Sequence, residues 1–255
     1  MGALHEGHVS LVRLSRKACG LTVVSIFVNP LQFSPGEDFE RYPRREAEDA
    51  ALLASAGAEL LYIPAAKDFY PPDFATAIEV AGVSGGGEGD ARPGHFRGVA
   101  TAVAKLFLQV QPDAAFFGRK DLQQVAVIRR MARDLDFPIR IEAGPTIREP
   151  DGLALSSRNA YLSPDERRAA TVLFRSLRAG IERAMAGERD ASGVRAAVVE
   201  TVAAEPLAEL DYAEVVRADD LQPFDRLEDR VPVLLALAVR IGRTRLIDNI
   251  PVDAS

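Results

Sequence analysis

The stretch Leu21-Thr22-Val23-Val24-Ser25-Ile26-Phe27-Val28 decides the class of fold. It is a run of mostly β-branched apolar residues, which is the composition of a strand buried on both faces of a parallel sheet. The polar sequence Asn29-Pro30-Leu31-Gln32-Phe33 follows it directly. Because ligands bind outside the carboxyl ends of the strands in open parallel sheets, this loop is a candidate for ligand contact.

Helical and strand patterns alternate on both sides of this run. Apolar spacing predicts helices at residues 8–17, 45–56, 99–109 and 121–135, and strands at 59–63, 76–80, 114–117 and 139–143. Strands that alternate with helices at this spacing are typical of an α/β domain with right-handed crossovers. We therefore expect a Rossmann-like parallel sheet within residues 1–147.

The pattern changes after about residue 148. Ser163-Pro164-Asp165-Glu166 is a strong helix start, with an N-cap serine and a capping-box glutamate. This helix is predicted to run to about residue 186, a second spans about 191–204, and strands follow at 211–217, 231–240 and 244–249. We expect residues 148–255 to form a smaller α+β domain.

The composition of the 255 residues is that of an ordinary globular protein, with 47% hydrophobic and 27% charged residues. The net charge of −6 argues against non-specific binding of nucleic acid. Cys19 is the only cysteine, which excludes an intramolecular disulfide and favours a cytoplasmic location. No apolar run approaches the ~20 residues that span a bilayer, so we expect neither a membrane nor a nucleic-acid partner. The glycine-rich residues 84–89 are predicted to form a mobile loop.

A His-x-Gly-His motif, His5-Glu6-Gly7-His8, stands at the start of the first predicted helix. Free N–H groups and the helix dipole make a helix N-terminus a favourable site for phosphate. The glycine allows a close backbone approach, and imidazole nitrogens can donate to phosphate oxygens. Two of the three histidines of the chain lie here. Taken alone, the motif also fits a surface helix start that happens to carry histidines.

Four further polar segments lie at predicted strand ends or in loops. Gln32 offers an amide suited to a hydroxyl or a carboxylate, although an ordinary loop amide would look the same. Arg92 and His95 share a glycine-containing loop that suits an anionic ligand or a solvated basic loop. Lys120 lies at a strand-to-helix turn, where a cation opposes the helix dipole unless it binds phosphate. The hydroxyls and guanidinium of Ser156-Ser157-Arg158-Asn159 suit a polyphosphate or a helix cap.

Taken together, these segments resemble the pantoate–β-alanine ligase (pantothenate synthetase) family of the HxGH nucleotidyltransferase superfamily. The resemblance covers essentially the whole chain. It is carried, in order, by MGALHEGH, VVSIFVNPLQF, RPGHFRGVAT, QPDAAFFGRKDLQQ, DGLALSSRN and RLIDN. It implies an α/β fold with a Rossmann-like sheet, a C-terminal domain that acts as a lid, and a homodimer.

The resemblance also implies a reaction. Members of the family convert ATP and pantoate to an enzyme-bound pantoyl adenylate and pyrophosphate, and β-alanine then displaces AMP to give pantothenate. The pantoate carboxylate is already ionised near neutral pH. The first step therefore needs in-line positioning and cations on the phosphates rather than a general base. Mg²⁺ accompanies ATP, as hard oxygen ligands prefer.

Carried over residue by residue, the family roles fall on matching positions of this chain. The catalytic residues would be His5, His8, Lys120 and Arg158. ATP would be bound by Met1, His5, His8, Gly118, Lys120, Asp121, Ser156, Ser157 and Arg158. Pantoate would be bound by Gln32, Tyr42, Arg92, His95 and Gln124, and Asp49 is a candidate outer ligand of Mg²⁺.

One expectation concerns the start of the chain, and two alternatives concern its function. The family has a strand before the His-x-Gly-His motif, whereas this sequence begins at Met1. We therefore expect a fragment or a misplaced start codon, and a parallel sheet without its first strand. Another nucleotidyltransferase of the same superfamily, or a truncated paralogue that binds nucleotide without turnover, would also fit. A class I aminoacyl-tRNA synthetase fragment is not favoured, because the chain is acidic and lacks a lysine-rich KMSKS-like loop.

Overall fold

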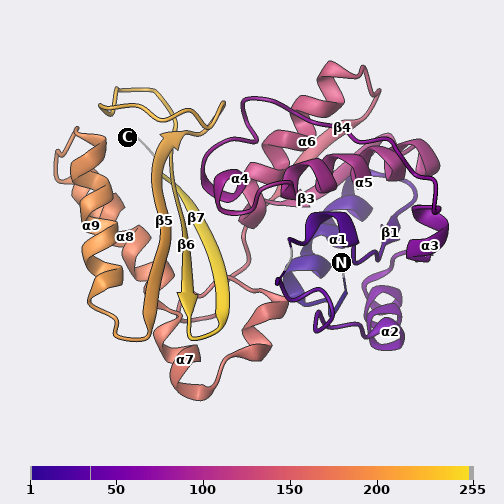
Figure 1. Cartoon of the computed structure of the whole chain (residues 1–255), viewed down its shortest axis with the longest axis horizontal. Helices are drawn as coiled ribbons and strands as arrows, with labels where there is room; N and C mark the ends of the chain where they lie inside the picture. Colours follow the sequence, from indigo (N-terminus) through magenta and orange to yellow (C-terminus); the bar gives the residue numbers. More distant parts are fainter. Residues whose placement is uncertain (1, 35, 253–255) are drawn as a thin grey trace.

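The structure is a computed structural model that describes residues 2–34 and 36–252. The N-terminal part of the chain packs on one side of the molecule, and three long strands near the C-terminus form a sheet on the other (Figure 1). This mixture of parallel pairs and a separate antiparallel sheet confirms the predicted α/β class with an α+β C-terminal part. Within the described residues, no helix is long and apolar enough to cross a membrane.

The first half of the chain begins with a parallel strand pair. Strand β1 (Val23–Ser25) pairs with β2 (Leu60–Tyr62). Helices α1 (Glu6–Ala18) and α2 (Glu46–Ala56) bury one apolar stripe each against this pair, in a small core centred on Ile26. The polar loop after β1 contains the 3-10 helix η1 (Pro30–Gln32), and the short helix α3 (Ala66–Phe69) follows β2.

A second parallel pair follows. Strand β3 (Ala114–Gly118) pairs with β4 (Arg140–Gly144), and the 3-10 helix η2 (Arg119–Asp121) and helix α6 (Leu122–Asp134) connect them. Helix α5 (His95–Val110) precedes β3 and supplies much of the surrounding core. That core contains Phe96, Val99, Ala100, Ala104, Phe107, Val127, Ile128 and Met131.

The sequence predicted more β structure in this half than the structure contains, in three places. The two strand pairs are separate two-stranded sheets rather than one continuous parallel sheet within the described residues. The predicted strand at residues 76–80 is irregular, because Ile78 donates its backbone N–H to the Thr101 hydroxyl of α5 instead of to a strand. The apolar run at 21–28 forms a strand only at Val23–Ser25, and Leu21 at its start is 56% exposed.

The C-terminal part builds an antiparallel sheet covered by helices. Strands β5 (Ala208–Arg217), β6 (Val233–Ile241) and β7 (Thr244–Val252) pair in sequence order. Helices α8 (Val172–Met185) and α9 (Ala191–Ala203) cover one face, which leaves the other face toward the N-terminal half (Figure 1). The long helix predicted from residue 164 is interrupted, since α7 (Pro164–Ala169) ends before α8 begins.

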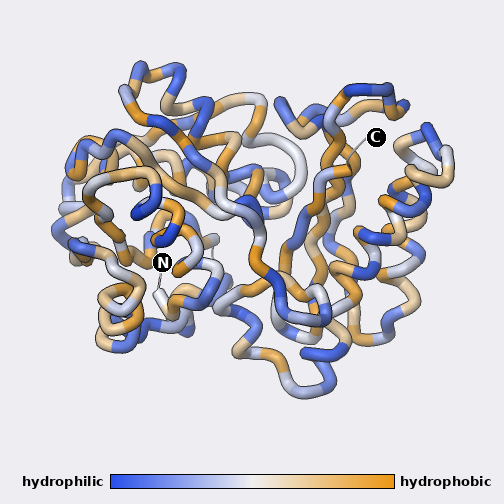
Figure 2. Tube along the Cα trace, turned by 180° about the vertical axis from the view of Figure 1, so that it is seen from behind, coloured by the Kyte–Doolittle hydropathy of each residue, from blue (hydrophilic) through white to orange (hydrophobic). Residues whose placement is uncertain are grey.

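The hydrophobic clusters lie on either side of residue 147, and the division into two domains there stays a prediction. One cluster of buried side chains runs from Leu153 to Val252 and joins α8 and α9 to the antiparallel sheet. The other three clusters consist of residues between Leu4 and Ile141. Figure 2 shows the strands of the C-terminal sheet as mostly hydrophobic and the peripheral loops as mostly hydrophilic. Among the described residues, each apolar core therefore belongs to one side of the boundary.

Candidate active site

The His-x-Gly-His motif forms the first turn of α1. His5 is the N-cap residue, and its Nδ1 accepts the backbone N–H of Gly7 at 3.2 Å. The Nδ1 atom of His8 accepts the backbone N–H of His5, also at 3.2 Å, which completes a capping box made of two histidines. An Nδ1 that accepts a hydrogen bond carries no proton, so each neutral ring bears its hydrogen on Nε2. Both motif histidines are therefore arranged to donate from Nε2.

The surroundings keep these two imidazoles neutral. Burial, together with the neighbouring His5 and Lys120, lowers the pKa of His8 to about 3. Burial and Lys120 also lower the pKa of His5. The two ring centroids are 4.2 Å apart. The site therefore presents neutral donors rather than imidazolium cations near neutral pH, and Lys120 is the cation beside them.

Asp49 of α2 holds the loop that leads into the motif. Its carboxylate accepts the backbone N–H of Ala3 at 2.8 Å and of Leu4 at 2.7 Å, and the residue is 3% exposed. With one oxygen on each amide, the carboxylate is well suited to fix the loop and poorly placed to face a metal ion. This geometry favours a positioning role over the predicted ligation of Mg²⁺. Among the described residues, no group of three or more His, Cys, Asp or Glu side chains is arranged to hold a metal.

A cleft of about 940 Å³ lies between the N-terminal half and the free face of the C-terminal sheet. The sequence-predicted residues that line it are Gln32, Tyr42, Arg92, His95, Lys120, Asp121, Gln124 and Arg158. A smaller cavity of about 200 Å³ is lined by Lys120 and Ser156, among others. Lys120 borders both spaces, and its charge also acts on His5 and His8.

The remaining predicted residues lie beside these cavities. His5, His8, Gly118 and Ser157 line neither of them, although both histidines are within electrostatic reach of Lys120. Ser157 instead hydrogen-bonds the Tyr42 hydroxyl at 3.0 Å. Met1 lies outside the described residues.

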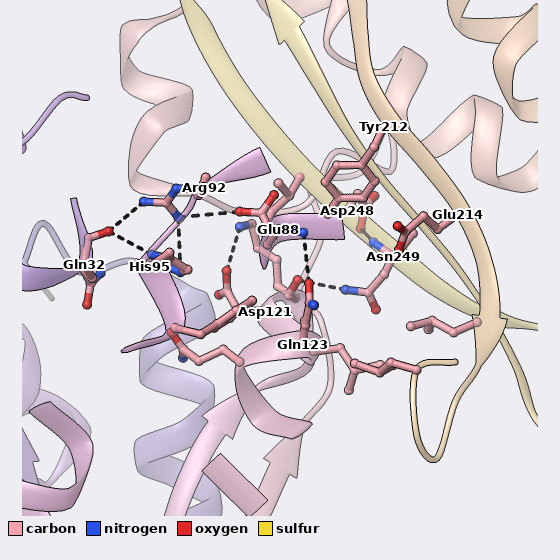
Figure 3. Close-up of a pocket in the computed structure, with 18 of the residues that line it drawn as sticks. Gln32, Glu88, Arg92, His95, Asp121, Gln123, Tyr212, Glu214, Asp248 and Asn249 are labelled. Carbon is pink, nitrogen blue, oxygen red and sulfur yellow. Dashed lines mark hydrogen bonds and ion pairs between the residues drawn. The ribbon is translucent and has the colours of Figure 1, made fainter. Parts of the chain in front are cut away.

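Arg92 and His95 brace the loop that carries Gln32. Arg92 forms two 2.7 Å hydrogen bonds with the Glu37 carboxylate and donates to Nε2 of His95 at 3.2 Å. Because an arginine can only donate, Nδ1 of His95 keeps its proton and donates to the Gln32 carbonyl at 2.9 Å. Figure 3 shows the contacts among Gln32, Arg92 and His95 at one end of the pocket. Burial and Arg92 lower the pKa of His95, which fits its neutral state.

Arg158 is also paired within the protein. Its guanidinium donates to both oxygens of Asp38, at 2.9 and 2.8 Å, and lies over the Tyr42 ring. The residue belongs to the 3-10 helix η3 (Ser157–Tyr161), which begins the C-terminal part. Arg158 thus joins the two halves of the chain at the edge of the cleft. To bind phosphate it must share its charge with Asp38.

The sequence analysis assigned no role to Asn29, which lies beside the cleft, or to two acidic residues that line it. Asn29 is 3% exposed, and its amide donates to the Gly98 carbonyl at 3.0 Å and to Oε1 of Gln32 at 3.2 Å, so it sets the orientation of Gln32. Its place between a strand and a proline was the available signal. Glu88 and Glu214 form an acidic wall, labelled in Figure 3. No sequence pattern indicates that these two glutamates lie together, because they are 126 residues apart in sequence.

The glycine-rich segment around Glu88 is ordered. Helix α4 (Gly87–Ala91) forms there, and the Gln123 amide donates to the carbonyls of Val83, Gly85 and Gly86. The backbone N–H of Gly87 donates to Glu214 of β5 at 2.7 Å. Burial raises the pKa of Glu214. The predicted loop therefore continues into a short helix from Gly87, and contacts from α6 and β5 hold the segment.

The fold and the site define an α/β protein in which a helix that begins with two histidines lies near a cleft lined by Lys120. Comparison with known proteins gives the family. A sequence model of the family described as pantoate-beta-alanine ligase matches residues 1–251. The chain belongs to the pantoate–β-alanine ligase family.

Relatives of known name and structure agree with this assignment. The pantothenate synthetase of Roseiflexus sp. (strain RS-1) is 54% identical over 254 residues, covering 100% of this chain and 91% of that protein. The pantothenate synthetase of Heliobacterium modesticaldum is 52% identical, covering 99% and 89%. A crystal structure of pantothenate synthetase from Thermus thermophilus has a TM-score of 0.94 at 48% identity, covering 99% and 91%. The pantoate-beta-alanine ligase of Francisella tularensis, complexed with beta-gamma ATP and beta-alanine, has a TM-score of 0.80 at 33% identity, covering 100% and 88%.

Proposed function

We propose that this protein condenses pantoate with β-alanine to give pantothenate, using ATP and releasing pyrophosphate and AMP. The observation that carries the proposal is the position of Lys120 between the neutral histidine donors of α1 and a cleft that Gln32 and Gln124 line. A cation, fixed N–H donors and side-chain amides in one place suit a substrate that combines phosphates, hydroxyls and a carboxylate. The ligands named for the Francisella tularensis structure, beta-gamma ATP and beta-alanine, support ATP and β-alanine as two of the three substrates.

The first step requires positioning more than proton transfer. A pantoate carboxylate oxygen attacks the α-phosphorus of ATP, a new O–P bond forms, and the bond to pyrophosphate breaks. Lys120 and the Nε2–H groups of His5 and His8 would stabilise the charge on the phosphates, and Gln32 and Gln124 would hold pantoate. Asp121, Gly118, Ser156 and Ser157 remain predicted contacts of ATP.

The second step is attack of the free amine of β-alanine on the acyl carbon. The C–N bond forms, the bond to AMP breaks, and the amine loses one proton. ATP would enter as its magnesium complex, since hard oxygen ligands of phosphates suit Mg²⁺ and the described residues offer no metal cluster. We also propose that the protein is a cytoplasmic homodimer. Light scattering of the purified protein tests the dimer, and fractionation of cells tests the location.

The assay separates the proposed ligase from other activities. ATP–pyrophosphate exchange should require pantoate, and AMP should be released in proportion to pantothenate when β-alanine is added. Exchange that requires a phosphorylated acceptor instead of pantoate would point to another nucleotidyltransferase. ATP binding by calorimetry without any release of AMP would also overturn the proposal.

Replacement of Lys120 tests the residue that carries the proposal. Its ammonium lies 3.7 Å from the Asp121 carboxylate and makes no shorter ion pair among the described residues, so Lys120→Ala should leave the fold intact. We expect the pantoate-dependent exchange rate to fall about 100-fold or more, as for the loss of a charged transition-state contact. Circular dichroism serves as the folding control. Near-normal exchange in this variant would remove Lys120 from the site.

A further inference from the structure

Asn249 connects the C-terminal sheet to the Lys120 turn. It lies on β7 within the sequence Arg245-Leu246-Ile247-Asp248-Asn249 and is 8% exposed. Its side-chain amide donates to the carbonyl of Lys120 at 2.8 Å and to that of Arg119 at 2.9 Å. Both hydrogens of one amide are therefore used on two consecutive carbonyls of η2. The contact joins residues 129 and 130 positions apart, across the predicted domain boundary.

The strand that carries Asn249 is itself braced. The neighbouring Asp248 carboxylate is buried and accepts two hydrogen bonds from Arg148, at 2.6 and 2.9 Å. Arg148 also donates to the backbone carbonyl of Asn249 at 3.2 Å. The backbone N–H of Asn249 donates to Asp248 at 2.8 Å. The backbone from which the Asn249 side chain extends is thus held in place by Arg148 and Asp248.

The turn that it holds has little support of its own. Gly118, the N-cap of η2, makes no side-chain cap hydrogen bond, and neither does Asp121, the N-cap of α6. A helix start without a capping side chain lacks a contribution of about 1 kcal/mol to its stability. Lys120 lies in this first turn and borders both cavities. A small rotation of the turn would move its ammonium relative to His5 and His8.

We infer that Asn249 is a positioning residue for Lys120, through which the C-terminal sheet sets the place of the phosphate-binding cation. Asn249 also lines the cleft, so a direct contact with a ligand is the competing role. The two roles differ before any ligand binds. A positioning residue changes the surroundings of Lys120 in the free protein, whereas a ligand contact does not. The link to catalysis rests on the proposed function of Lys120.

The chain makes this experiment simple, because it has four lysines: Lys17, Lys67, Lys105 and Lys120. Reductive methylation with ¹³C labels each of them for NMR, and Lys120→Arg assigns the resonance of Lys120. In Asn249→Ala we expect the Lys120 resonance of the free protein to move while the other three keep their positions. Asn249→Leu keeps a side chain of similar size, loses both donors and adds no charge beside Lys120, so it provides a second variant if the first is unstable. It should shift the same resonance.

Arg245→Gln is the matched control. Arg245 lies on the same strand and crosses the boundary to Glu88 at 2.6 Å, but no contact joins it to the Lys120 turn in the described structure. This variant should leave the Lys120 resonance unchanged. A shift of the same size in it would mean that any loosening of the boundary suffices, which overturns a specific role of Asn249.

Affinity for a non-hydrolysable ATP analogue, measured by calorimetry on unmethylated protein, completes the test. We expect the Kd of Asn249→Ala to rise about tenfold, because a displaced Lys120 ammonium would lose about one charge-assisted contact with the phosphates. An unchanged Lys120 resonance in the free variant overturns the inference, whatever the Kd. If the parent protein itself shows no response of Lys120 to the analogue, the proposed function of Lys120 fails instead.

Discussion

The three histidines of the chain are used in two opposite ways. His5 and His8 accept backbone N–H groups at Nδ1 and keep their hydrogens on Nε2. His95 accepts a hydrogen bond from Arg92 at Nε2 and donates one from Nδ1 to the backbone carbonyl of Gln32. The protonated nitrogen is thus set by the backbone or by an arginine in each case. The first two histidines can serve a ligand, and the third serves the protein.

Replacing His8 by two different amides separates its two nitrogens. In His8→Asn the amide oxygen can replace Nδ1 and accept the His5 N–H, but no donor reaches the place of Nε2. In His8→Gln the longer amide can replace the Nε2–H donor. We expect pantoate-dependent exchange to fall about 100-fold in His8→Asn and about tenfold in His8→Gln, while His8→Asn keeps the melting temperature better. Equal rates in the two variants would show that the Nε2 donor is unimportant.

Residue types were easier to predict than their partners. The sequence singled out Gln32 and Lys120 because polar side chains after buried strands face the ligand edge of a sheet, and His5 and His8 because they begin a helix. It could not show that Arg92 pairs with Glu37, or that Arg158 pairs with Asp38. Those acids lie 55 and 120 positions away, in a loop without periodic pattern. Only the folded chain brings them together.

At the scale of elements, the site depends on two close approaches. In the first, α2 supplies Asp49 to the loop before α1. In the second, α5 lies so near η1 that a Cβ on Gly98 would be 2.1 Å from the Leu31 carbonyl oxygen. Asn29 crosses the same gap to the Gly98 carbonyl. The motif histidines and Gln32 are therefore each placed by a neighbouring helix.

Removal of the Asp49 carboxylate should destabilise the protein without changing its need for magnesium. Asp49→Ala leaves two backbone amides without a charged acceptor, so we expect the free energy of unfolding to fall by about 3 kcal/mol. Urea titration measures this change. The Mg²⁺ concentration for half-maximal activity should stay that of the parent in Asp49→Asn. A raised magnesium requirement at parental stability would restore the metal role that the sequence predicted.

Adding a methyl group at Gly98 should force α5 and η1 apart. We expect Gly98→Ala to lower the free energy of unfolding by about 3 kcal/mol, as for other overpacked sites, and to raise the KM for pantoate because Gln32 lies in η1. Gly20→Ala is the control, since a Cβ there meets nothing within 4 Å and should change stability by less than about 0.5 kcal/mol. A stable Gly98→Ala with parental kinetics would contradict the close approach.

The pattern of elements was largely predictable, and its exceptions have physical causes. The alternation of helices and strands, the Ser163 capping box and the C-terminal meander are all present. The strand predicted at 76–80 failed because its backbone is satisfied by Thr101, a contact that no local pattern reveals. The predicted single helix from residue 164 is broken near Thr171, although the apolar spacing continues through the break.

At the scale of the whole molecule, the lowered pKa values of His5, His8 and His95 predict a loss of stability in mild acid. Below about pH 6.5, histidines of the unfolded chain become protonated, whereas the native histidines stay neutral. The free energy of unfolding should therefore fall as the pH drops from 6.5, down to about pH 3 for His8. The slope is at most about 1.4 kcal/mol per pH unit for each histidine.

Urea midpoints at pH 7.5, 6.5 and 5.5 measure this dependence. The stability should change little between the two higher values and decline below them, before most carboxylates titrate. His95→Gln should give a shallower decline than the parent, because one of the three groups is gone. A midpoint that is constant down to pH 5.5 would show that the native histidines take up protons as readily as the unfolded chain does.

The separation of the apolar cores has a consequence for the order of events during synthesis. The three clusters between Leu4 and Ile141 require no side chain from the meander, and the fourth requires none from before Leu153, within the described residues. The first three can therefore assemble on the ribosome while the last hundred residues are still being translated. The cleft cannot, because its far wall is β5 to β7 and the amide that holds Lys120 lies near the end of β7. Binding competence is then among the last properties that a nascent chain acquires.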